Sequence, residues 1–283
     1  MTDKTCIVTG ANSGIGKETA LGLARMGARV VLVCRNQHKG EAAVADIRRE
    51  VPSAQLDLLI ADMSSLASVR ALAAQLEQRC PRIDVLVNNA GAALTTRAVS
   101  VDGIEMTVAG NHLGPALLTL LLLDRLKASA PSRVVNVSSE AHRSARLDLS
   151  DLQYERHKYK GINAYGQSKL LMNAFTFELA RRLEGSRVTA NCLHPGVVAT
   201  NIWALDMPLV VKILIAAMKP FMLNAKKGAA CQLHVATAPD LAQVSGQYFV
   251  KSKAVAPSAL SKNPDVVRGV WQWTLKTAGV VVN

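Results

Sequence analysis

The sequence has few aromatic residues and no long apolar run. Aromatic residues make up 4% of its 283 residues and are not interleaved with the basic ones, so it lacks the stacking surfaces of single-strand nucleic-acid binders. The apolar run from Leu117 to Leu123 is far too short to span a bilayer. The first expected strand follows Met1 so closely that no signal peptide fits before it. We therefore expect a cytoplasmic protein that does not bind nucleic acid.

The cysteines and histidines show no disulfide or metal pattern. Five cysteines are present without a CxxC pair, and the histidines lack metal-ligand spacing to carboxylates or thiols. A thiol in or beside an apolar strand, as at Cys6, Cys34 and Cys192, is typical of a buried core residue. We expect no metal and no oxidising compartment.

The net charge is strongly positive and unevenly distributed. Lys and Arg number 33 against 21 Asp and Glu, which gives a formal net charge of +12. From Met207 onward, nine basic residues accompany only two acidic ones, so more than half of the excess lies in this last part. An anionic partner is indicated, and a nucleic acid, a membrane surface or an anionic cofactor would each supply one.

Apolar, β-branched runs alternate with amphipathic stretches along the chain. The expected strands are 6–9, 29–34, 56–61, 83–88, 133–138, 187–193 and 247–250, and the expected helices include 14–26, 40–50, 64–79 and 117–127. The strands are continuously apolar, which indicates burial on both faces. This alternation predicts an α/β fold with a doubly wound parallel sheet and helices on both faces. No linker-like stretch divides 1–283, so we expect a single domain.

A glycine-rich turn follows the first expected strand. The segment from Thr9 to Gly16 has the spacing Gly-x-x-x-Gly-x-Gly and leads directly into a helix. Glycines let the backbone turn sharply and approach a pyrophosphate, whose charge is met by the free N–H groups of the helix N-terminus. A tight strand-to-helix turn would also favour glycine, but this position at the start of the chain indicates a nucleotide site.

The end of the second strand bears on the choice of nucleotide. An acidic residue at that place would bind the ribose 2′-hydroxyl and favour NAD. Instead, Arg35 and Asn36 follow Cys34 with no carboxylate. The Arg35 guanidinium can form a bidentate contact with a 2′-phosphate, so we predict NADP. The alternative is an ordinary arginine at a strand end.

Together with downstream motifs, these features resemble the short-chain dehydrogenase/reductase family, and within it the retinol-dehydrogenase-like members. The motifs occur in the order of the family along almost the whole chain: 9–16, 62–63, 88–91, 111–114, 136–139, 165–169 and 194–200. The resemblance implies a Rossmann-type fold and the following cofactor-binding residues: Gly10, Asn12, Ser13, Gly14, Ile15, Gly16, Arg35, Asn36, Asp62, Met63, Asn89, Ala90, Gly91, Tyr165, Lys169, Pro195, Gly196, Val198 and Thr200. Among them, Asp62 and Met63 are expected to flank the adenine.

Tyr165 and Lys169 lie one helical turn apart and so share a helix face. A free tyrosine has a pKa of about 10, and a nearby ammonium favours tyrosinate and lowers that pKa. We expect Tyr165 to exchange a proton with the substrate oxygen, and Lys169 to tune Tyr165 and hold the nicotinamide ribose. By resemblance, Ser139 rather than Ser138 donates a hydrogen bond to the same oxygen, because the catalytic serine of the family is usually the second of such a pair.

Asn111 is the fourth catalytic residue that the resemblance implies. In the family its backbone carbonyl, released from the helix ladder, holds a water that leads to the lysine. Pro115 follows four residues later and has no N–H to bond that carbonyl. Our hypothesis is that Pro115 enforces a kink that frees the Asn111 carbonyl. The alternative is a helix that begins near Leu113 with Pro115 in its first turn.

The region that forms the substrate lid in the family, about 200–227, is strongly apolar here. An apolar helical lid implies a bulky hydrophobic alcohol or carbonyl substrate. The expected substrate contacts are Ser139, His142, Trp203, Leu205 and Met207. The segment could instead pack on the core or dimerise. Lys212 and Lys219 argue against a membrane span, while peripheral membrane contact stays open.

The resulting prediction is an NADP-dependent oxidoreductase that transfers hydride between nicotinamide and a hydrophobic alcohol/carbonyl pair. Asn111, Ser139, Tyr165 and Lys169 are the expected catalytic residues. The alternatives are a non-redox cyclase or lyase on the same scaffold and a non-catalytic, NADP-sensing binding protein. The family often pairs through the helices that precede and carry the catalytic residues, which leaves a homodimer or homotetramer open.

Overall fold

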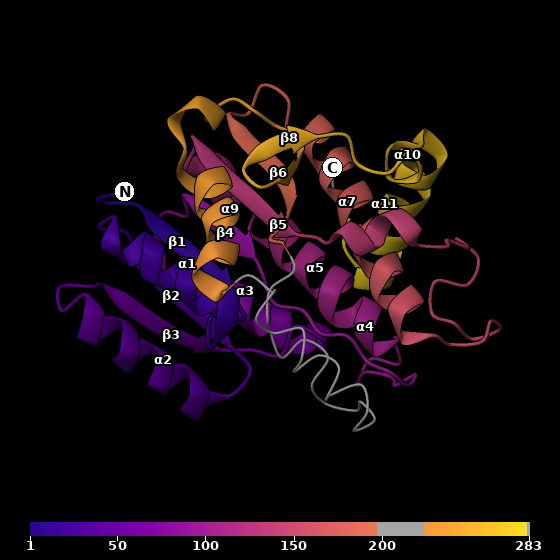
Figure 1. Cartoon of the computed structure of the whole chain (residues 1–283), viewed down its shortest axis with the longest axis horizontal. Coiled ribbons are helices and arrows are strands. Elements are labelled where there is room, and N and C mark those ends of the chain that lie inside the picture. The colour runs from indigo at the N-terminus through magenta and orange to yellow at the C-terminus, as the bar shows by residue number, and fades with distance from the viewer. Residues whose placement is uncertain (197–223, 282–283) are drawn as a thin grey trace.

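The computed structural model describes residues 1–196 and 224–281 (Figure 1). The strands are β1 Thr5–Thr9, β2 Arg29–Cys34, β3 Leu56–Ile60, β4 Val85–Asn88, β5 Ser132–Val137, β6 Val188–His194, β7 Tyr248–Val250 and β8 Lys253–Val255. The helices are α1 Gly14–Arg25, α2 Gln37–Glu50, α3 Leu66–Arg79, α4 Met106–Val108, α5 Gly114–Leu121, α6 Leu123–Ala128, α7 Gly161–Arg182, α9 Ala225–Thr237, α10 Ala259–Lys262 and α11 Pro264–Ala278. A π-helical turn, η1, covers Ala109–Leu113, and 3-10 turns cover Glu140–Ser144 (η2) and Pro239–Leu241 (η5).

The strands of the described residues form one sheet in the order β3-β2-β1-β4-β5-β6-β7-β8. Neighbours from β3 to β7 are parallel, which confirms the predicted doubly wound topology. The sequence did not predict β8, which adds an antiparallel strand at the β7 edge of this parallel sheet. Lys251 and Ser252 join the two strands with φ values of 50° and 62°. Left-handed backbone at both positions turns the chain straight back on itself.

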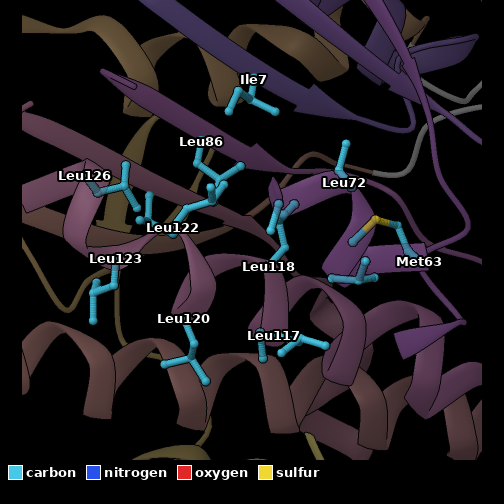
Figure 2. Close-up of a cluster of buried hydrophobic side chains, with 14 of the residues drawn as sticks. Ile7, Met63, Leu72, Leu86, Leu117, Leu118, Leu120, Leu122, Leu123 and Leu126 are labelled. Atoms are coloured by element: carbon cyan, nitrogen blue, oxygen red, sulfur yellow. The ribbon is translucent and has the colours of Figure 1, made fainter. Parts of the chain in front are cut away.

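Each central strand is buried on both faces, as its continuous apolar sequence predicted. Ile7 and Leu86 point to one core, which the side chains of α3, α5, α6, α7 and α11 complete. Figure 2 shows both residues beside the leucines of α5 and α6. The alternate residues Val8 and Val87 point to a second core built with α1, α2 and α9. Successive strand residues therefore anchor helices on opposite faces of the sheet.

Two expected boundaries move in the structure. The leucine-rich helix begins at Gly114, earlier than expected, and is divided at Leu122 into α5 and α6. The expected lid extended to residue 227, but α9 starts at Ala225, capped by the side chain of Asn224. The helix packs on α1 and the sheet farther along, through residues such as Cys231 and Val235.

The C-terminal helix α11 covers much of α7. Val266 and Val270 of α11 pack with Leu170 and Leu171 of α7, and the rings of Phe175 and Trp271 stack with centroids 5.4 Å apart. In the part of the chain that the structure describes, no helix has the length and apolarity needed to cross a membrane.

Candidate active site

The turn between β1 and α1 is packed too tightly for side chains at its glycines. Gly10 and Gly14 have φ values of +67° and +56°, which L side chains rarely adopt. A Cβ added at Gly16 would lie 2.4 Å from both the Gly10 carbonyl oxygen and Asn89 Nδ2. Ser13 precedes α1 but makes no side-chain cap hydrogen bond. The first N–H groups of α1 therefore remain available for an anion, as a pyrophosphate site requires.

A hydrogen-bonded brace joins this turn to the end of β4. Thr9 Oγ1 accepts from the backbone N–H groups of Asn89 and Ala90, each at 3.0 Å, and Asn89 Nδ2 donates to the Thr9 carbonyl at 2.9 Å. On the other side, Gln232 Nε2 donates to Asn89 Oδ1 at 3.0 Å, and Thr19 donates to Gln232 Oε1 at 2.8 Å. Asn89 thus shapes the cofactor turn mainly by holding its backbone.

Sequence reasoning did not identify Thr19 or Gln232. The two residues are 213 positions apart and meet only because α9 packs on α1. No sequence signal marks the pair, because the burial of Gln232, which requires polar partners, is visible only in the structure.

The predicted adenosine-side residues lie at the ends of β2 and β3. Arg35 is exposed directly after β2, with no hydrogen bond or ion pair to any described residue. Asn36 caps α2 by accepting from the Lys39 N–H at 2.9 Å. Asp62 accepts from the Ser64 N–H at 2.8 Å. The Met63 side chain packs in the core (Figure 2), so only its backbone remains to face an adenine.

The predicted catalytic trio is brought together at the carboxyl end of β5. Ser139 forms a side-chain hydrogen bond with Tyr165, and Lys169 Nζ lies 5.6 Å from the centroid of the Tyr165 ring. Lys169 Nζ also donates to the Val137 carbonyl at 2.9 Å. Ser138 is buried and donates instead to the Lys169 carbonyl at 3.3 Å. The geometry therefore singles out Ser139 as the serine beside Tyr165.

Burial dominates the ionisation of this trio. It raises the pKa of Tyr165, and the hydrogen bond from Ser139 opposes that rise. It lowers the pKa of Lys169 to about 8, because a buried ammonium loses its hydration. The expectation that the pKa of Tyr165 is lowered overall is therefore wrong, because burial outweighs the effects that favour tyrosinate. The raised pKa instead keeps the Tyr165 hydroxyl protonated at neutral pH.

Asn111 lies in the π-helical turn η1, directly before α5. The Gly114 N–H donates to the Ala109 carbonyl, five residues back, and Pro115 then offers no N–H to the carbonyls behind it. The expected interruption of the helix ladder is present, in the form of a π turn. Pro115 also occupies the first turn of α5, so the alternative reading correctly describes where the regular helix begins.

The Asn111 side chain is fixed by three hydrogen bonds. Its Oδ1 accepts from the Ala92 N–H at 2.8 Å, and its Nδ2 donates to the Ala92 carbonyl at 2.8 Å and to Ser168 Oγ at 3.0 Å. A Cβ added at Gly91 would lie 3.2 Å from Asn111 Oδ1 and 3.4 Å from Lys169 Nζ. The loop after β4 therefore passes directly beside Asn111 and Lys169.

Not every expected site residue is placed at the site. His142 is fully buried, and both of its ring nitrogens have backbone partners. The expectation that His142 contacts the substrate is therefore wrong, because it has no free polar atom to offer. Pro195 and Gly196 follow β6 as predicted. The remaining expected residues lie outside the described part of the chain: Val198, Thr200, Trp203, Leu205 and Met207.

Comparison with known proteins identifies the family to which the chain belongs. The family described as short chain dehydrogenase matches residues 4–207. The chain belongs to the short-chain dehydrogenase family. Retinol dehydrogenase 13 of Homo sapiens is 43% identical over 281 residues, which cover 98% of this chain and 85% of that protein. Retinol dehydrogenase 12 of Mus musculus is 41% identical over 277 residues, covering 98% and 87%. The resemblance to the retinol-dehydrogenase-like members is thereby confirmed.

Solved structures agree with this family membership. The crystal structure of an uncharacterized protein from Mycobacterium Paratuberculosis matches with a TM-score of 0.80 and 33% identity, covering 99% of this chain and 94% of that one. The fold and the order of the motifs are thus those of the family. Within the described residues, no group of three or more His, Cys, Asp or Glu side chains is arranged to hold a metal, and the absence of a metal stays a prediction.

Proposed function

We propose that the chain is an NADP-dependent oxidoreductase that transfers hydride between nicotinamide and a bulky, hydrophobic alcohol/carbonyl pair. The observation that carries the proposal is the trio of Ser139, Tyr165 and Lys169 at the carboxyl end of β5, on the same edge of the parallel sheet as the glycine turn after β1 and separated from it by β4. Relatives about 40% identical are named retinol dehydrogenases, which supports a lipophilic substrate with a hydroxyl or carbonyl group.

The site residues fit a dinucleotide. The backbone at Gly10 and Gly16 leaves no room for a Cβ, and the N-terminus of α1 has uncapped N–H groups and no acidic residue in its first turn. Both features suit a pyrophosphate. When bound, NADP(H) supplies or accepts the hydride. A Cβ added at Gly91 would lie 3.4 Å from Lys169 Nζ, so this ammonium lies beside the loop after β4, which supports a role in holding a ribose hydroxyl.

The chain's own residues supply the proton. In carbonyl reduction, the Ser139 and Tyr165 hydroxyls hydrogen-bond the substrate oxygen, and Tyr165 donates its proton to that oxygen as hydride reaches the carbon. Lys169, buried beside the Tyr165 ring, favours the tyrosinate that remains. The raised pKa of Tyr165 keeps the proton donor loaded at neutral pH.

The preference for NADP rests on Arg35. It is the first residue after β2, exposed, and accompanied by no carboxylate in the turn to α2. A guanidinium at this place attracts a 2′-phosphate, while a carboxylate would repel it.

Turnover tests the redox assignment. NADPH oxidation is followed with a panel of lipophilic aldehydes and ketones, including retinaldehyde, for the wild-type protein and for Tyr165→Phe. We expect wild-type turnover with at least one member of the panel and at least a hundredfold lower kcat in the variant, since proton transfer by a positioned side chain contributes about that factor. NADPH binding without turnover beyond that of the variant would instead support an NADP-sensing protein.

Cofactor affinity tests the role of Arg35. We expect Arg35→Ala to lose at least about tenfold in NADPH affinity, worth about 1.4 kcal/mol, and to leave NADH affinity nearly unchanged. Binding is measured by the fluorescence of each reduced cofactor. The exposed Arg49, at the far end of α2, supplies a matched control as Arg49→Ala. Equal losses for both cofactors would refute the NADP preference.

A further inference from the structure

His142 holds the backbone of Ser139. The Ser139 carbonyl accepts from His142 Nδ1 at 2.7 Å and from the His142 N–H at 3.1 Å. On the other side of the ring, His142 Nε2 lies 3.0 Å from the Ser258 N–H, which donates to it. The imidazole therefore bridges the residue beside Tyr165 to the segment that leads into α10.

The two backbone partners fix the state of the imidazole ring. A backbone N–H can only donate, so Nε2 must carry a lone pair. A carbonyl oxygen can only accept, so Nδ1 must carry the hydrogen. His142 is therefore a neutral imidazole with its proton on Nδ1. A proton added at Nε2 would point at the Ser258 N–H and break that contact.

The surroundings of the ring keep it neutral and in place. Burial lowers the pKa of His142 and outweighs the hydrogen bond to the Ser139 carbonyl, which raises it; the charge of Arg143 lowers the pKa further, and that of Glu140 raises it. The Tyr248 ring of β7 lies edge-on at 4.8 Å, and its hydroxyl donates to Glu140 at 2.7 Å. His194 of β6 is a further titratable neighbour, and its charge interacts with those of both Glu140 and His142.

The turn that carries His142 is wedged against α7. A Cβ added at Gly166, the residue after Tyr165, would lie 2.7 Å from the Ala141 carbonyl oxygen. On its outer side, Arg143 donates to the Ala256 carbonyl at 2.7 Å. A shift of η2 would therefore change the distance between Ser139 and Tyr165, because the turn cannot move toward α7.

We propose that His142 is a positioning residue of the active site, which as the Nδ1-protonated imidazole locks Ser139 against Tyr165 and ties it to Ser258. This role rests on the proposed function, because it acts through Ser139. It replaces the substrate contact that the sequence suggested. A hydrogen bond lost here is expected to reduce kcat rather than cofactor affinity, since no cofactor-binding residue is held by the ring.

Three substitutions separate the two contacts of the ring. His142→Asn places an amide donor near the Nδ1 position, His142→Gln places an acceptor near the Nε2 position, and His142→Phe keeps the volume without either. We expect kcat to fall about tenfold or more in the Gln and Phe variants and least in the Asn variant. The KM for NADPH should stay constant. His234→Asn, on α9, serves as the control.

The acid limb of the pH profile gives a second kinetic readout. Protonation of His142 should lower the kcat of the wild-type protein at acid pH, and His142→Asn should remove that limb. Equal kcat in all three variants, or losses that follow only their thermal stability, would overturn the proposal.

A measurement that does not depend on turnover distinguishes a failure of this proposal from a failure of the proposed function. Nitrogen-15 NMR of histidine-labelled wild-type protein, with the His142 signal assigned from its loss in a variant or by sequential assignment, is expected to show the neutral Nδ1–H tautomer at neutral pH. An Nε2–H tautomer or a charged ring would overturn the role of His142 even if the enzyme is active. Absent wild-type turnover together with the expected tautomer would instead show that the proposed function has failed, and the positioning role with it.

Discussion

Holding the Lys169 ammonium in its buried position is electrostatically unfavourable for the folded chain. It is 2% exposed, and burial lowers its pKa from 10.5 to about 8. At neutral pH the folded chain must therefore hold a charge that is better solvated in the unfolded chain. Active sites often retain such unfavourable groups because the chemistry needs them. Here the ammonium lies beside the Tyr165 ring, where it favours the tyrosinate state.

Substituting Lys169 should change how stability depends on pH. A depressed folded-state pKa means that the unfolded chain binds the proton more tightly, so wild-type stability rises with pH between about 8 and 10.5. Relative to Lys169→Met, we expect a rise of about 3 kcal/mol over that range, at about 1.4 kcal/mol per pH unit. Urea unfolding of both proteins at several pH values measures this difference in stability. Stability curves that stay parallel across the range would contradict the burial of a titrating amine.

Some residue roles could be predicted from sequence and others could not. Ser139, Tyr165 and Lys169 were found because their spacing and order carry the family pattern, and the structure brings them together. His142 was misplaced, because sequence does not show that its two nitrogens meet backbone groups 3 and 116 residues away. Gln232 left no pattern for the same reason.

Among the elements, the turn from β1 to α1 is where backbone geometry most directly sets function. An alanine at Gly16 would place its Cβ 2.4 Å from the Gly10 carbonyl oxygen and Asn89 Nδ2. The clash falls on the brace that ties the turn to β4. Gly110 in η1 differs, because the nearest atom to an added Cβ is Ser64 Cβ at 3.8 Å.

We expect Gly16→Ala to weaken NADPH binding at least about a hundredfold, worth about 2.7 kcal/mol, because the backbone must shift away from the pyrophosphate site. Gly110→Ala should leave NADPH binding unchanged. Its free energy of unfolding should lie within about 0.5 kcal/mol of the wild-type value or above it, since alanine favours helix more than glycine does. Cofactor fluorescence and thermal unfolding measure the two effects. NADPH affinity equal to that of the wild type in Gly16→Ala would show that the turn does not shape the cofactor site.

The elements also show the limits of pattern reading. The strands from β1 to β7 were predicted, because short apolar runs, most of them rich in β-branched residues, appear directly in the sequence. β8 was missed, since Lys253, Ala254 and Val255 are all exposed and become a strand only by pairing with β7. The π turn at Asn111 was anticipated only as an interruption, because a proline reveals a missing donor without saying how the helix adjusts.

At the scale of the whole molecule, α11 occupies the face on which family members often pair. From Ala164 to Ala180 of α7, every residue is buried except Phe177, and Lys262 Nζ lies over the Phe177 ring at 5.3 Å from its centroid. Little of α7 is left to contact a second chain. We therefore expect any self-association to use a surface other than this stretch of α7.

We expect the molar mass in solution to be the same for the wild-type protein and for Phe177→Glu. The substitution places a charge at the one partly exposed position of that stretch of α7, where it would split a dimer packed on this helix. Light scattering after size-exclusion chromatography measures both masses. A wild-type dimer that becomes a monomer in Phe177→Glu would show that α7 pairs despite α11.

The central claim is that the trio transfers a proton while NADPH transfers a hydride to a lipophilic carbonyl. Its most direct test uses NADPH deuterated at the transferable position and retinaldehyde or another carbonyl found active, with mass spectrometry of the product. The account predicts an alcohol with one deuterium on the carbon that bore the carbonyl, formed by the wild-type protein and at least a hundredfold more slowly by Tyr165→Phe. Product without deuterium, or equal rates in the two proteins, would contradict it.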